Sequence, residues 1–327
     1  MGWIEIAFGS DYQNFRADRQ ERPVIRGVFL SLFVILVIPF QPVFAEEAGE
    51  IQTNDVIVFF EGPLESAANE VAEIYSGLKL ELEETLGWRM SFRPKVLLIN
   101  NRRTFTRIAG SHLFVALAIP QRKLVVIDYS KMNTAPFTLG TTLKHELCHL
   151  LLYHHIGTNL PKWLDEGVSQ WVSDGIAEII MGRRPSVLKE AALSGNYIGI
   201  RELMESFPED KRSLLLAYEE SRSLVEYIHG KFGLEGIRSI LANLKNGDEV
   251  DVAILKSLLI PLDELERKWH AHLRRKTTWF TYLTANLYVI LFFLAALITI
   301  VGFIRIIIKK RRYYDSQDDY PLHSRES

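Results

Sequence analysis

The chain lacks the features that would point to a disulfide scaffold or a nucleic-acid partner. It has one cysteine in 327 residues, Cys148, so no internal disulfide bond can form. A lone cysteine neither requires nor excludes an oxidising compartment. Lys and Arg number 38 against 40 Asp and Glu, and this slightly acidic balance argues against binding nucleic acid. There is no internal repeat or low-complexity tract, and the length suits one large or two modest domains.

Long apolar runs are also scarce, and the first of the two is short. Residues 27–38 hold twelve apolar or small residues, which is typical of the central region of a signal peptide rather than of a spanning helix. Val43 and Ala45 fit a signal-peptidase site, so we expect residues 1–45 to be removed. The leader is unusually long and its charges balance. An uncleaved N-terminal anchor, or a start codon assigned too early, is therefore the alternative.

The second apolar run predicts a transmembrane helix at residues 280–304. It has 25 residues and no charge, which is enough to cross about 30 Å of hydrocarbon. Five basic residues follow it between Arg305 and Arg312, and clustered basic residues stay in the cytoplasm. Basic residues also precede the run, so the secretory leader decides the orientation. We expect residues 46–276 to lie outside the cytoplasm, with the lipid bilayer as a partner, and 305–327 to form an unstructured cytoplasmic tail.

The exported part begins with mixed strand and helix patterns and ends as helix. Helical spacing of apolar residues covers 64–86, ended by Gly87, and a shorter helix is expected at 102–108. From Thr138 onward nearly every pattern is helical. We therefore predict an α+β fold in which a sheet layer leads into a helical half, with the chemistry at the junction. The strand patterns lie at 55–60, 95–100, 113–119 and 123–129, the last two as a pair.

The sequence LKHELCHLLLYHH, residues 143–155, contains the strongest chemical signal. His145 and His149 are four residues apart, so a helix places both on one face, where each can offer a ring nitrogen to one metal ion. Glu146 lies beside His145. The spacing H-E-x-x-H is that of zincins, in which two histidines bind zinc and the glutamate acts as general base.

A catalytic zinc ion needs a third protein ligand, and two residues compete for this role. His155 is six residues after His149, where metzincins place a third histidine. That arrangement needs a glycine that breaks the helix, but Leu152 stands there and the helix pattern continues to Gly157. Glu166, in PKWLDEGVSQW, follows His149 by 17 residues and is the favoured ligand. His154 and His155 are then expected to be solvated residues at the helix end.

The segments HELCHLLL and LPKWLDEGVSQW resemble the gluzincin metallopeptidases, and in particular the bacterial peptidase-MA-like domains. The resemblance extends over residues 55–275. It implies a zincin-like fold and one zinc ion bound by His145, His149 and Glu166, with Glu146 as base. The aminopeptidase N-like branch has asparagine where this chain has Asp165. Its G-x-M-E-N motif for the substrate amine is not found here, which argues against an exopeptidase acting on free amino termini.

Further residues are candidates for supporting roles. Tyr218 matches the position of a tyrosine that stabilises the oxyanion in gluzincins, with His229 as a weaker candidate and core packing as the plainer reading of Tyr218. Gln170 and Asp174 could orient the histidines, although each fits an ordinary helix residue as well. Cys148 is expected to be a small buried residue rather than a redox-active thiol. We interpret the remaining basic cluster, Arg102, Arg103 and Arg107, as a solvated helix face.

These observations predict a membrane-anchored zinc metallopeptidase that hydrolyses peptides or proteins outside the cytoplasm. Zinc would lower the pKa of bound water to about 7, and Glu146 would accept its proton. The alternatives are a non-catalytic binding module built on the same scaffold and a protease that is latent until a partner opens it. The presence of all four key residues weakens the binding-module reading. Convergence of Glu166 with the two histidines would support the metal site.

Overall fold

A computed structural model describes residues 48–174 and 186–318 of the chain. The predicted signal peptide, residues 1–45, lies outside this range. The chain divides into two compact units, Met1–Trp269 and His270–Ser327. The helices are α3 (Glu65–Leu86), α4 (Arg102–Ala109), α5 (Leu139–Ile156), α6 (Lys162–Val172), α7 (Val187–Ser194), α8 (Lys211–Lys245), α9 (Val250–Leu258), α10 (Leu262–Ala285) and α11 (Leu287–Asp318).

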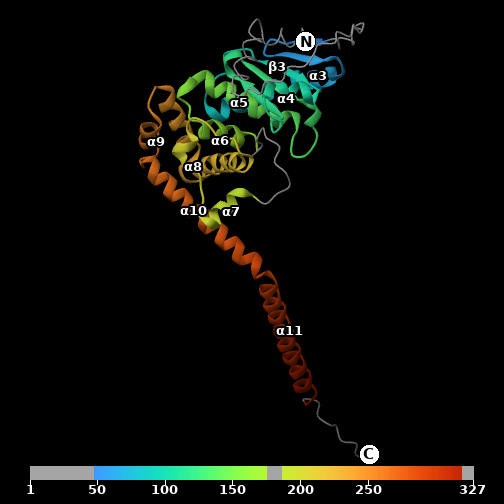
Figure 1. The fold of residues 1–327 in the computed structure, drawn as a ribbon. Coiled ribbons are helices and arrows are strands. Elements are labelled where there is room, and N and C mark those ends of the chain that lie inside the picture. Colours follow the sequence, from blue (N-terminus) through green and yellow to red (C-terminus); the bar gives the residue numbers. More distant parts are fainter. Residues whose placement is uncertain (1–47, 175–185, 319–327) are drawn as a thin grey trace, which may run out of the picture. The chain divides into compact units, whose positions relative to one another are not determined.

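The first unit contains a five-stranded mixed sheet with the strand order β1-β2-β3-β5-β4 (Figure 1). Strands β2, β3 and β5 run parallel to one another, whereas β1 and β4 are antiparallel to their neighbours. All four predicted strands are present. The unpredicted strand β1 has the sequence AGEIQ, which carries no apolar alternation. The strands are β1 (Ala48–Gln52), β2 (Ile57–Glu61), β3 (Lys95–Ile99), β4 (Ala116–Ile119) and β5 (Leu124–Asp128).

The register of the strands gives the sheet two apolar faces. Phe59, Leu97 and Val126 are paired across β2, β3 and β5 and so share one face. Helix α4 covers this face through Phe105 and Ile108. Because successive strand residues point to opposite sides, the other face is left for two helices. These are α3, which packs on β2, and α5, which packs on β4 and β5.

The ends of the predicted helices are confirmed by their capping groups. Helix α3 ends at Gly87, whose φ of 73° is a left-handed conformation that glycine adopts without strain. The Thr138 side chain accepts a hydrogen bond from the Thr141 amide and so caps the start of α5. Helix α5 then continues unbroken to Ile156, and Gly157 follows. This continuity decides which residues can converge on a metal ion.

The helical half holds α6 between α5 and α8, both of which pack on it. Gly167 permits the close approach of α6 to α8, because a Cβ atom there would lie 2.5 Å from the carbonyl oxygen of Ser221. Figure 1 shows α6 and α8 beside the layer that contains the sheet and α5. The metal-binding candidates therefore lie where the two halves of the first unit meet, as the α+β prediction required.

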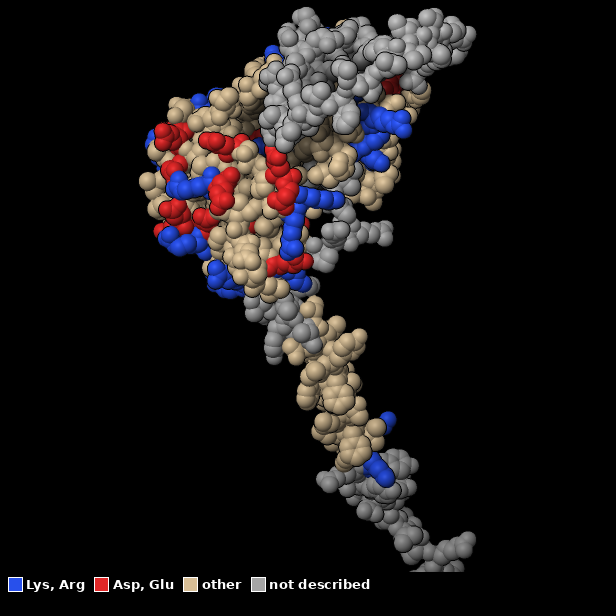
Figure 2. Space-filling view, in the orientation of Figure 1, with Lys and Arg blue, Asp and Glu red and all other residues tan. Residues whose placement is uncertain are grey.

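In the second unit, α11 is long and apolar enough to cross a membrane over Leu287–Lys310, and none of that stretch is buried. Figure 2 shows its uncharged surface, with Lys and Arg only toward its end. The helix begins after a turn at Asn286 rather than at residue 280. It also continues to Asp318, so the expectation of an unstructured tail is wrong for residues 305–318.

Candidate metal centre

His145 and His149 lie one turn apart on α5 and are both buried, with exposures of 0% and 5%. Their Nε2 atoms are 3.1 Å from each other. Two nitrogen ligands about 2.0–2.1 Å from one tetrahedral ion would be about 3.3 Å apart. The helical spacing has therefore placed the two ring nitrogens at the separation that one zinc ion requires.

Glu166, on the neighbouring helix α6, supplies a third ligand atom at the same point. Its Oε2 atom lies 3.8 Å from His145 Nε2 and 3.7 Å from His149 Nε2. The three candidate ligand atoms all lie within 4.8 Å of one another, and all three side chains are buried. The predicted convergence is thus confirmed, with α5 supplying two ligands and α6 the third.

His155 does not take part in this cluster. Its Nε2 atom donates a hydrogen bond to the carbonyl oxygen of Arg89 at 2.9 Å, and its ring packs against Trp88 at 4.7 Å. His154 bonds Ser91 and packs against Phe92. The preference for Glu166 over His155 is therefore confirmed. His154 is exposed at the helix end, as expected, whereas His155 is half-buried. Both rings also fasten the end of α5 to the segment that precedes β3.

Two polar residues of α6 and the residue that follows its end orient the histidine rings, and the sequence reasoning missed all three. His149 Nδ1 donates to Asp165 Oδ1 at 2.7 Å, and Ser169 Oγ lies 3.2 Å from the same nitrogen. His145 Nδ1 donates to Ser173 Oγ at 3.3 Å. The signal was their spacing, since residues 165, 169 and 173 are four apart and follow one face of α6 to just beyond its end at Val172. Such partners fix the ring orientation and raise the basicity of a metal-binding histidine.

The two residues suggested for this orienting role lie elsewhere. Gln170 is buried, but its side-chain amide donates to the backbone carbonyls of Glu166 and Tyr218 rather than to a histidine. It therefore ties α6 to α8 beside the ligand glutamate. Asp174 is exposed at the end of α6. The bond to Tyr218 was not foreseeable from sequence spacing, because it joins Gln170 to another helix.

The electrostatics of the cluster favour a positive charge. Burial alone would lower the pKa of His149, but the carboxylates of Asp165 and Glu166 outweigh it and raise that pKa to about 10. Burial and the neighbouring His149 hold the pKa of His145 well below its ordinary value. The His149 ring therefore carries a positive charge near neutral pH. A bound metal cation would supply a positive charge at the same place.

The donor set fits a zinc ion. Two imidazole nitrogens and one carboxylate oxygen are the ligands of a catalytic zinc site that keeps a fourth position open. Glu166 Oε2 has no hydrogen-bond partner among the described residues, although it is completely buried. Its other oxygen accepts a hydrogen bond from Lys162 Nζ at 2.6 Å, which holds the carboxylate in place. A bound cation would satisfy the remaining oxygen.

Glu146 is completely buried next to the ligand pair. Its carboxylate is one of the groups that raise the pKa of His149, so it acts on the cluster electrostatically. Consecutive residues of an α-helix point about 100° apart, so the side chains of His145 and Glu146 lie on adjoining faces of α5. This arrangement suits a base that serves a metal ion without binding it.

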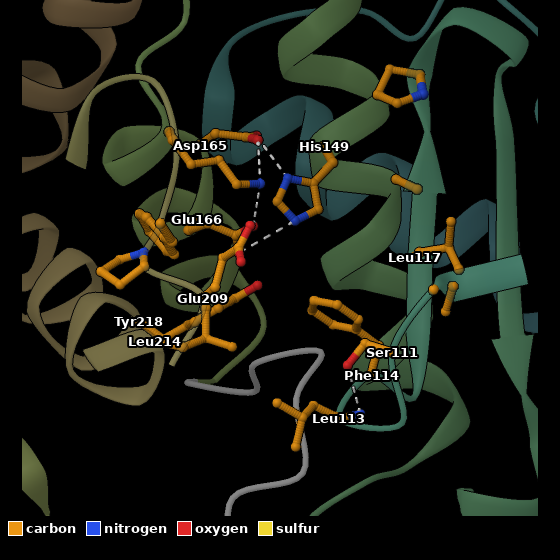
Figure 3. Close-up of a pocket in the computed structure, with 17 residues that line it drawn as sticks. Ser111, Leu113, Phe114, Leu117, His149, Asp165, Glu166, Glu209, Leu214 and Tyr218 are labelled. Carbon is orange, nitrogen blue, oxygen red and sulfur yellow. Dashed lines mark hydrogen bonds and ion pairs between the residues drawn. The ribbon is translucent and has the colours of Figure 1, made fainter. Parts of the chain in front are cut away.

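A pocket of about 570 Å³ opens beside the cluster, lined by His149, Lys162, Asp165 and Glu166 (Figure 3). Tyr218 also lines it, is only 2% exposed and packs edge-on against Phe207. His229 instead lies exposed against Trp171 and is not part of the lining. The other lining residues are Ala109, Gly110, Ser111, Leu113, Phe114, Leu117, Ala118, Pro120, Phe207, Pro208, Glu209 and Leu214.

Two further predictions concern residues near the site. Cys148 is completely buried, and burial raises the pKa of its thiol to about 12, so it acts as a small core residue.

Arg102 is not a solvated residue, contrary to expectation. Its guanidinium donates to the carbonyls of His112 and Phe114 and to the buried carboxylate of Asp128. Arg102 therefore fixes the loop that precedes β4.

One family model and two solved structures are similar to the chain. The model of the Peptidase MA superfamily matches residues 115–275, a shorter span than the expected 55–275. No curated protein matches the chain significantly. Among solved structures, Legionella pneumophila aminopeptidase A in complex with aspartic acid is similar, with 16% identity and a TM-score of 0.41. Yeast LTA4 hydrolase in complex with bestatin is similar as well, with 13% identity and a TM-score of 0.42.

The matches to these two structures are partial. They cover 68% and 65% of this chain, but the chain spans only 27% and 36% of the two proteins. The family match, by contrast, contains the whole ligand cluster and the residues that orient it. Residues 115–275 of the chain are therefore similar to the Peptidase MA superfamily over the segment that carries the cluster of His145, His149 and Glu166.

Proposed function

We propose that the chain is a membrane-anchored, zinc-dependent metallopeptidase that hydrolyses peptide bonds. One zinc ion per chain would be held by His145, His149 and Glu166. The observation that carries the proposal is the convergence of three buried ligand atoms within 4.8 Å of one another, beside the buried carboxylate of Glu146. The family match over residues 115–275 supports the same reaction class.

Each residue of the site has its own role in the proposed reaction. When bound, zinc supplies a Lewis acid that makes water acidic near neutral pH. Glu146 accepts the proton of the attacking water and later delivers it to the leaving amine. Asp165 keeps the proton of the His149 ring on Nδ1, so that Nε2 faces the ligand cluster. Tyr218 lines the pocket and donates its hydroxyl hydrogen to the oxyanion that develops on the carbonyl oxygen.

The sheet supplies a means of holding an extended peptide. Strand β4 is the last strand of the sheet order, and no strand pairs with its outer edge within residues 48–174 and 186–318. Leu117 and Ala118 of β4 line the pocket beside the cluster. An extended peptide that hydrogen-bonds to such an edge gains affinity from its main chain, whatever its sequence. This supports peptides and unfolded protein segments as substrates.

Helix α11 would anchor this domain in a lipid bilayer. Its apolar stretch, Leu287–Lys310, has the length and composition of a spanning helix. Arg305, Lys309 and Lys310 stand at the end of that stretch, which favours a cytoplasmic location for the following residues. The peptidase domain would then lie on the extracytoplasmic side, near substrates of the cell envelope.

The proposal is tested with the full chain purified in detergent, as wild type and as Glu146→Gln. Each protein is incubated with a diverse peptide mixture, with and without a chelator, and the products are identified by mass spectrometry. We expect wild-type cleavage that the chelator abolishes and zinc restores. The variant should bind one zinc ion but be slower by a factor of about 10² to 10⁴, the usual contribution of a general base.

Two results would contradict the proposal. Absence of both cleavage and bound zinc in a folded chain would leave a non-catalytic binding module on the same scaffold. Stoichiometric zinc without cleavage of any peptide would leave a latent enzyme that requires a partner or a processing step. Measuring zinc by mass spectrometry of metals in the same samples separates the two.

A further inference from the structure

We propose that the part of α10 that precedes α11 is a docking surface for the phosphate groups of anionic phospholipids, which Arg274, Arg275 and Lys276 bind. The inference goes beyond the proposed peptidase function and rests on one part of it, the membrane anchor. It follows from the exposure of these three residues, from their lack of acidic partners among the described residues and from their place in the chain.

The chain around the proposed anchor carries charge of one sign only. No Asp or Glu occurs in the sequence between Glu266 and Asp315, whereas basic residues flank the apolar stretch of α11 on both sides. Arg274, Arg275 and Lys276 precede that stretch and are called the juxtamembrane cluster below. The cluster and α11 both belong to the second unit. Negative charge that matches the cluster must therefore come from outside this part of the chain.

The juxtamembrane cluster is exposed on all sides of its helix. A buried stripe runs along α10 through Leu265, Trp269 and Leu273, and it ends there. The three residues of the cluster follow at once, and all of them are exposed. Consecutive residues of an α-helix point about 100° apart, so three of them surround most of the helix. Beyond Leu273, α10 therefore presents positive charge in nearly every direction.

The protein does not neutralise these charges within the part of the chain that the structure describes. Earlier in the same helix, Lys268 Nζ lies 3.1 Å from Glu264 Oε1, whereas no residue of the cluster forms an ion pair with a described residue. The charge of Arg274 also acts on its own helix. Burial and, after it, this charge lower the pKa of His270 to about 4. The cluster is thus available to an anionic partner.

The order of residue types along the chain matches the layers of a bilayer. Trp279 follows Lys276 by three residues and Tyr282 by six, and the apolar stretch of α11 begins at Leu287. Trp and Tyr are the residues that favour the membrane–water interface. Three helix residues rise by about 4.5 Å, and the headgroup region on each side of the hydrocarbon is about 5–8 Å thick. The cluster therefore stands at the level of the headgroups.

A break in the helix allows the cluster to approach the lipid. Helix α10 ends at Ala285, a turn follows at Asn286, and α11 begins at Leu287. With this turn, α10 can incline toward the leaflet while α11 crosses the bilayer. Long Lys and Arg side chains also extend their charged ends toward the interface. The phosphate groups then accept charge-assisted hydrogen bonds, for which the guanidinium group is especially suited.

Membrane topology does not account for the juxtamembrane cluster. Basic residues beside a spanning helix favour the cytoplasm, but the proposed orientation places this cluster on the opposite side. The surface nearest to it there is the headgroup layer of the same membrane, so anionic phospholipid is the partner that fits. Each Lys or Arg near an anionic surface strengthens binding about fivefold. Three such residues reinforce α11 but are too few to anchor the chain alone.

The experiment uses the full chain in nanodiscs that contain equal amounts of phosphatidylcholine and phosphatidylglycerol with the same acyl chains. After extraction with a mild detergent, mass spectrometry measures the ratio of the two lipids that stay on the protein. In the variant Arg274→Gln/Arg275→Gln/Lys276→Gln, we expect the ratio of phosphatidylglycerol to phosphatidylcholine to fall at least about fivefold, the contribution of one basic residue. High salt should reduce the difference from wild type, because it screens exposed charges.

Two control variants separate charge at this place from charge in general. Arg103→Gln/Arg107→Gln/Lys231→Gln removes three exposed basic residues of α4 and α8 and should keep the wild-type ratio. Arg274→Lys/Arg275→Lys keeps the charge of the cluster and should keep most of the preference. The basic residues that follow the apolar stretch are the same in every variant, so their lipid contacts cancel in the comparison. Thermal unfolding confirms that each variant is folded.

The outcomes separate this inference from the proposed function. Equal lipid ratios in the wild type and the triple variant of the cluster would overturn the inference and leave both the anchor and the peptidase. An equal loss of preference in the α4 and α8 control would also overturn it. A chain that carbonate releases from membranes would reject the anchor and the inference together. A preference that depends on the cluster, in a chain that cleaves no peptide, would support the inference and reject the peptidase.

Discussion

Helices α5 and α11 are both rich in apolar residues, but their surroundings differ completely. In α5, eleven of 18 residues are buried, and among them are His145, Glu146 and His149. In α11, the apolar residues are exposed, with values of 69% for Phe292 and 70% for Ile298. The first helix has its polar groups inside the protein, and the second has its apolar groups outside.

The difference teaches where each helix obtains its stabilisation. Burying His145 and Glu146 is unfavourable unless partners compensate for lost hydration, and α6 supplies those partners. The exposed apolar stretch of α11 is long enough to cross a membrane, and the proposed membrane anchor rests on it. Metal binding and catalytic activity should therefore depend on α5 and its neighbours, whereas the location of the protein in the cell should depend on α11.

The largest effect should follow removal of α11. Deleting residues 286–327 should move the protein from the membrane fraction to the soluble fraction without loss of activity on soluble peptides, because the ligand cluster lies in the first unit. Deleting 319–327 alone is the control and should leave the protein in the membrane. A truncated protein that still sediments with membranes would instead show that the N-terminal apolar segment, residues 27–38, is an uncleaved anchor.

A smaller effect is expected when a partner of α5 loses its charge. Asp165→Asn retains an oxygen that can accept a hydrogen bond from His149 but removes the negative charge beside the ring. Zinc affinity should fall by about 10- to 100-fold, as is usual for such orienting residues. Competition with a chromogenic chelator measures it. Asp174→Asn, at the exposed end of α6, should leave the affinity unchanged.

The contact of α6 with α8 can be broken at Gly167. A Cβ atom there would lie 2.5 Å from the Ser221 carbonyl oxygen and 2.7 Å from a methyl group of Val225. Gly167→Ala should therefore lower the free energy of unfolding by about 1–3 kcal/mol, the usual cost of overpacking. Gly77→Ala on α3, with nothing within 4 Å, should be neutral or stabilising. Denaturant titration of both variants tests this, and equal stabilities would contradict it.

The smallest effect concerns Glu220, a buried acid of α8 whose Oε2 has no hydrogen-bond partner among the described residues. Burial raises its pKa from 4.5 to about 8, so the folded state holds a proton that the unfolded chain releases. The stability linked to this proton is fully present below pH 4.5 and is lost as the pH rises through 8.

Glu220→Gln should remove that dependence, since the amide oxygen can still accept the hydrogen bond from the Ile198 amide. Between pH 5 and pH 9 the wild-type melting temperature should fall further than that of the variant, by roughly 2–4 °C for each kcal/mol of linked stability. Parallel melting curves at both pH values would contradict the assignment.

The comparison of α5 with α11 also explains how far sequence reasoning reached. Periodicity predicted α3, α4 and α5 closely, because each helix has an apolar stripe and a recognisable end such as Gly87 or Gly157. Strand β1 was missed, since its sequence carries no alternation and only pairing with β2 makes it a strand. The start of α11 was misplaced because the apolar run continues through the turn at Asn286.

The sequence by itself determined that His145 and His149 share one helix face, because they are four residues apart, and that an unbroken helix turns His155 away from it. The meeting of Glu166 with the two histidines depends on the packing of α6 on α5. Only the tertiary structure decided which groups support those ligands. Asp165, Ser169 and Ser173 reach the histidine rings only because α6 crosses α5. Spacing along a helix is a local property of the chain, whereas contacts between elements depend on packing that no local pattern encodes.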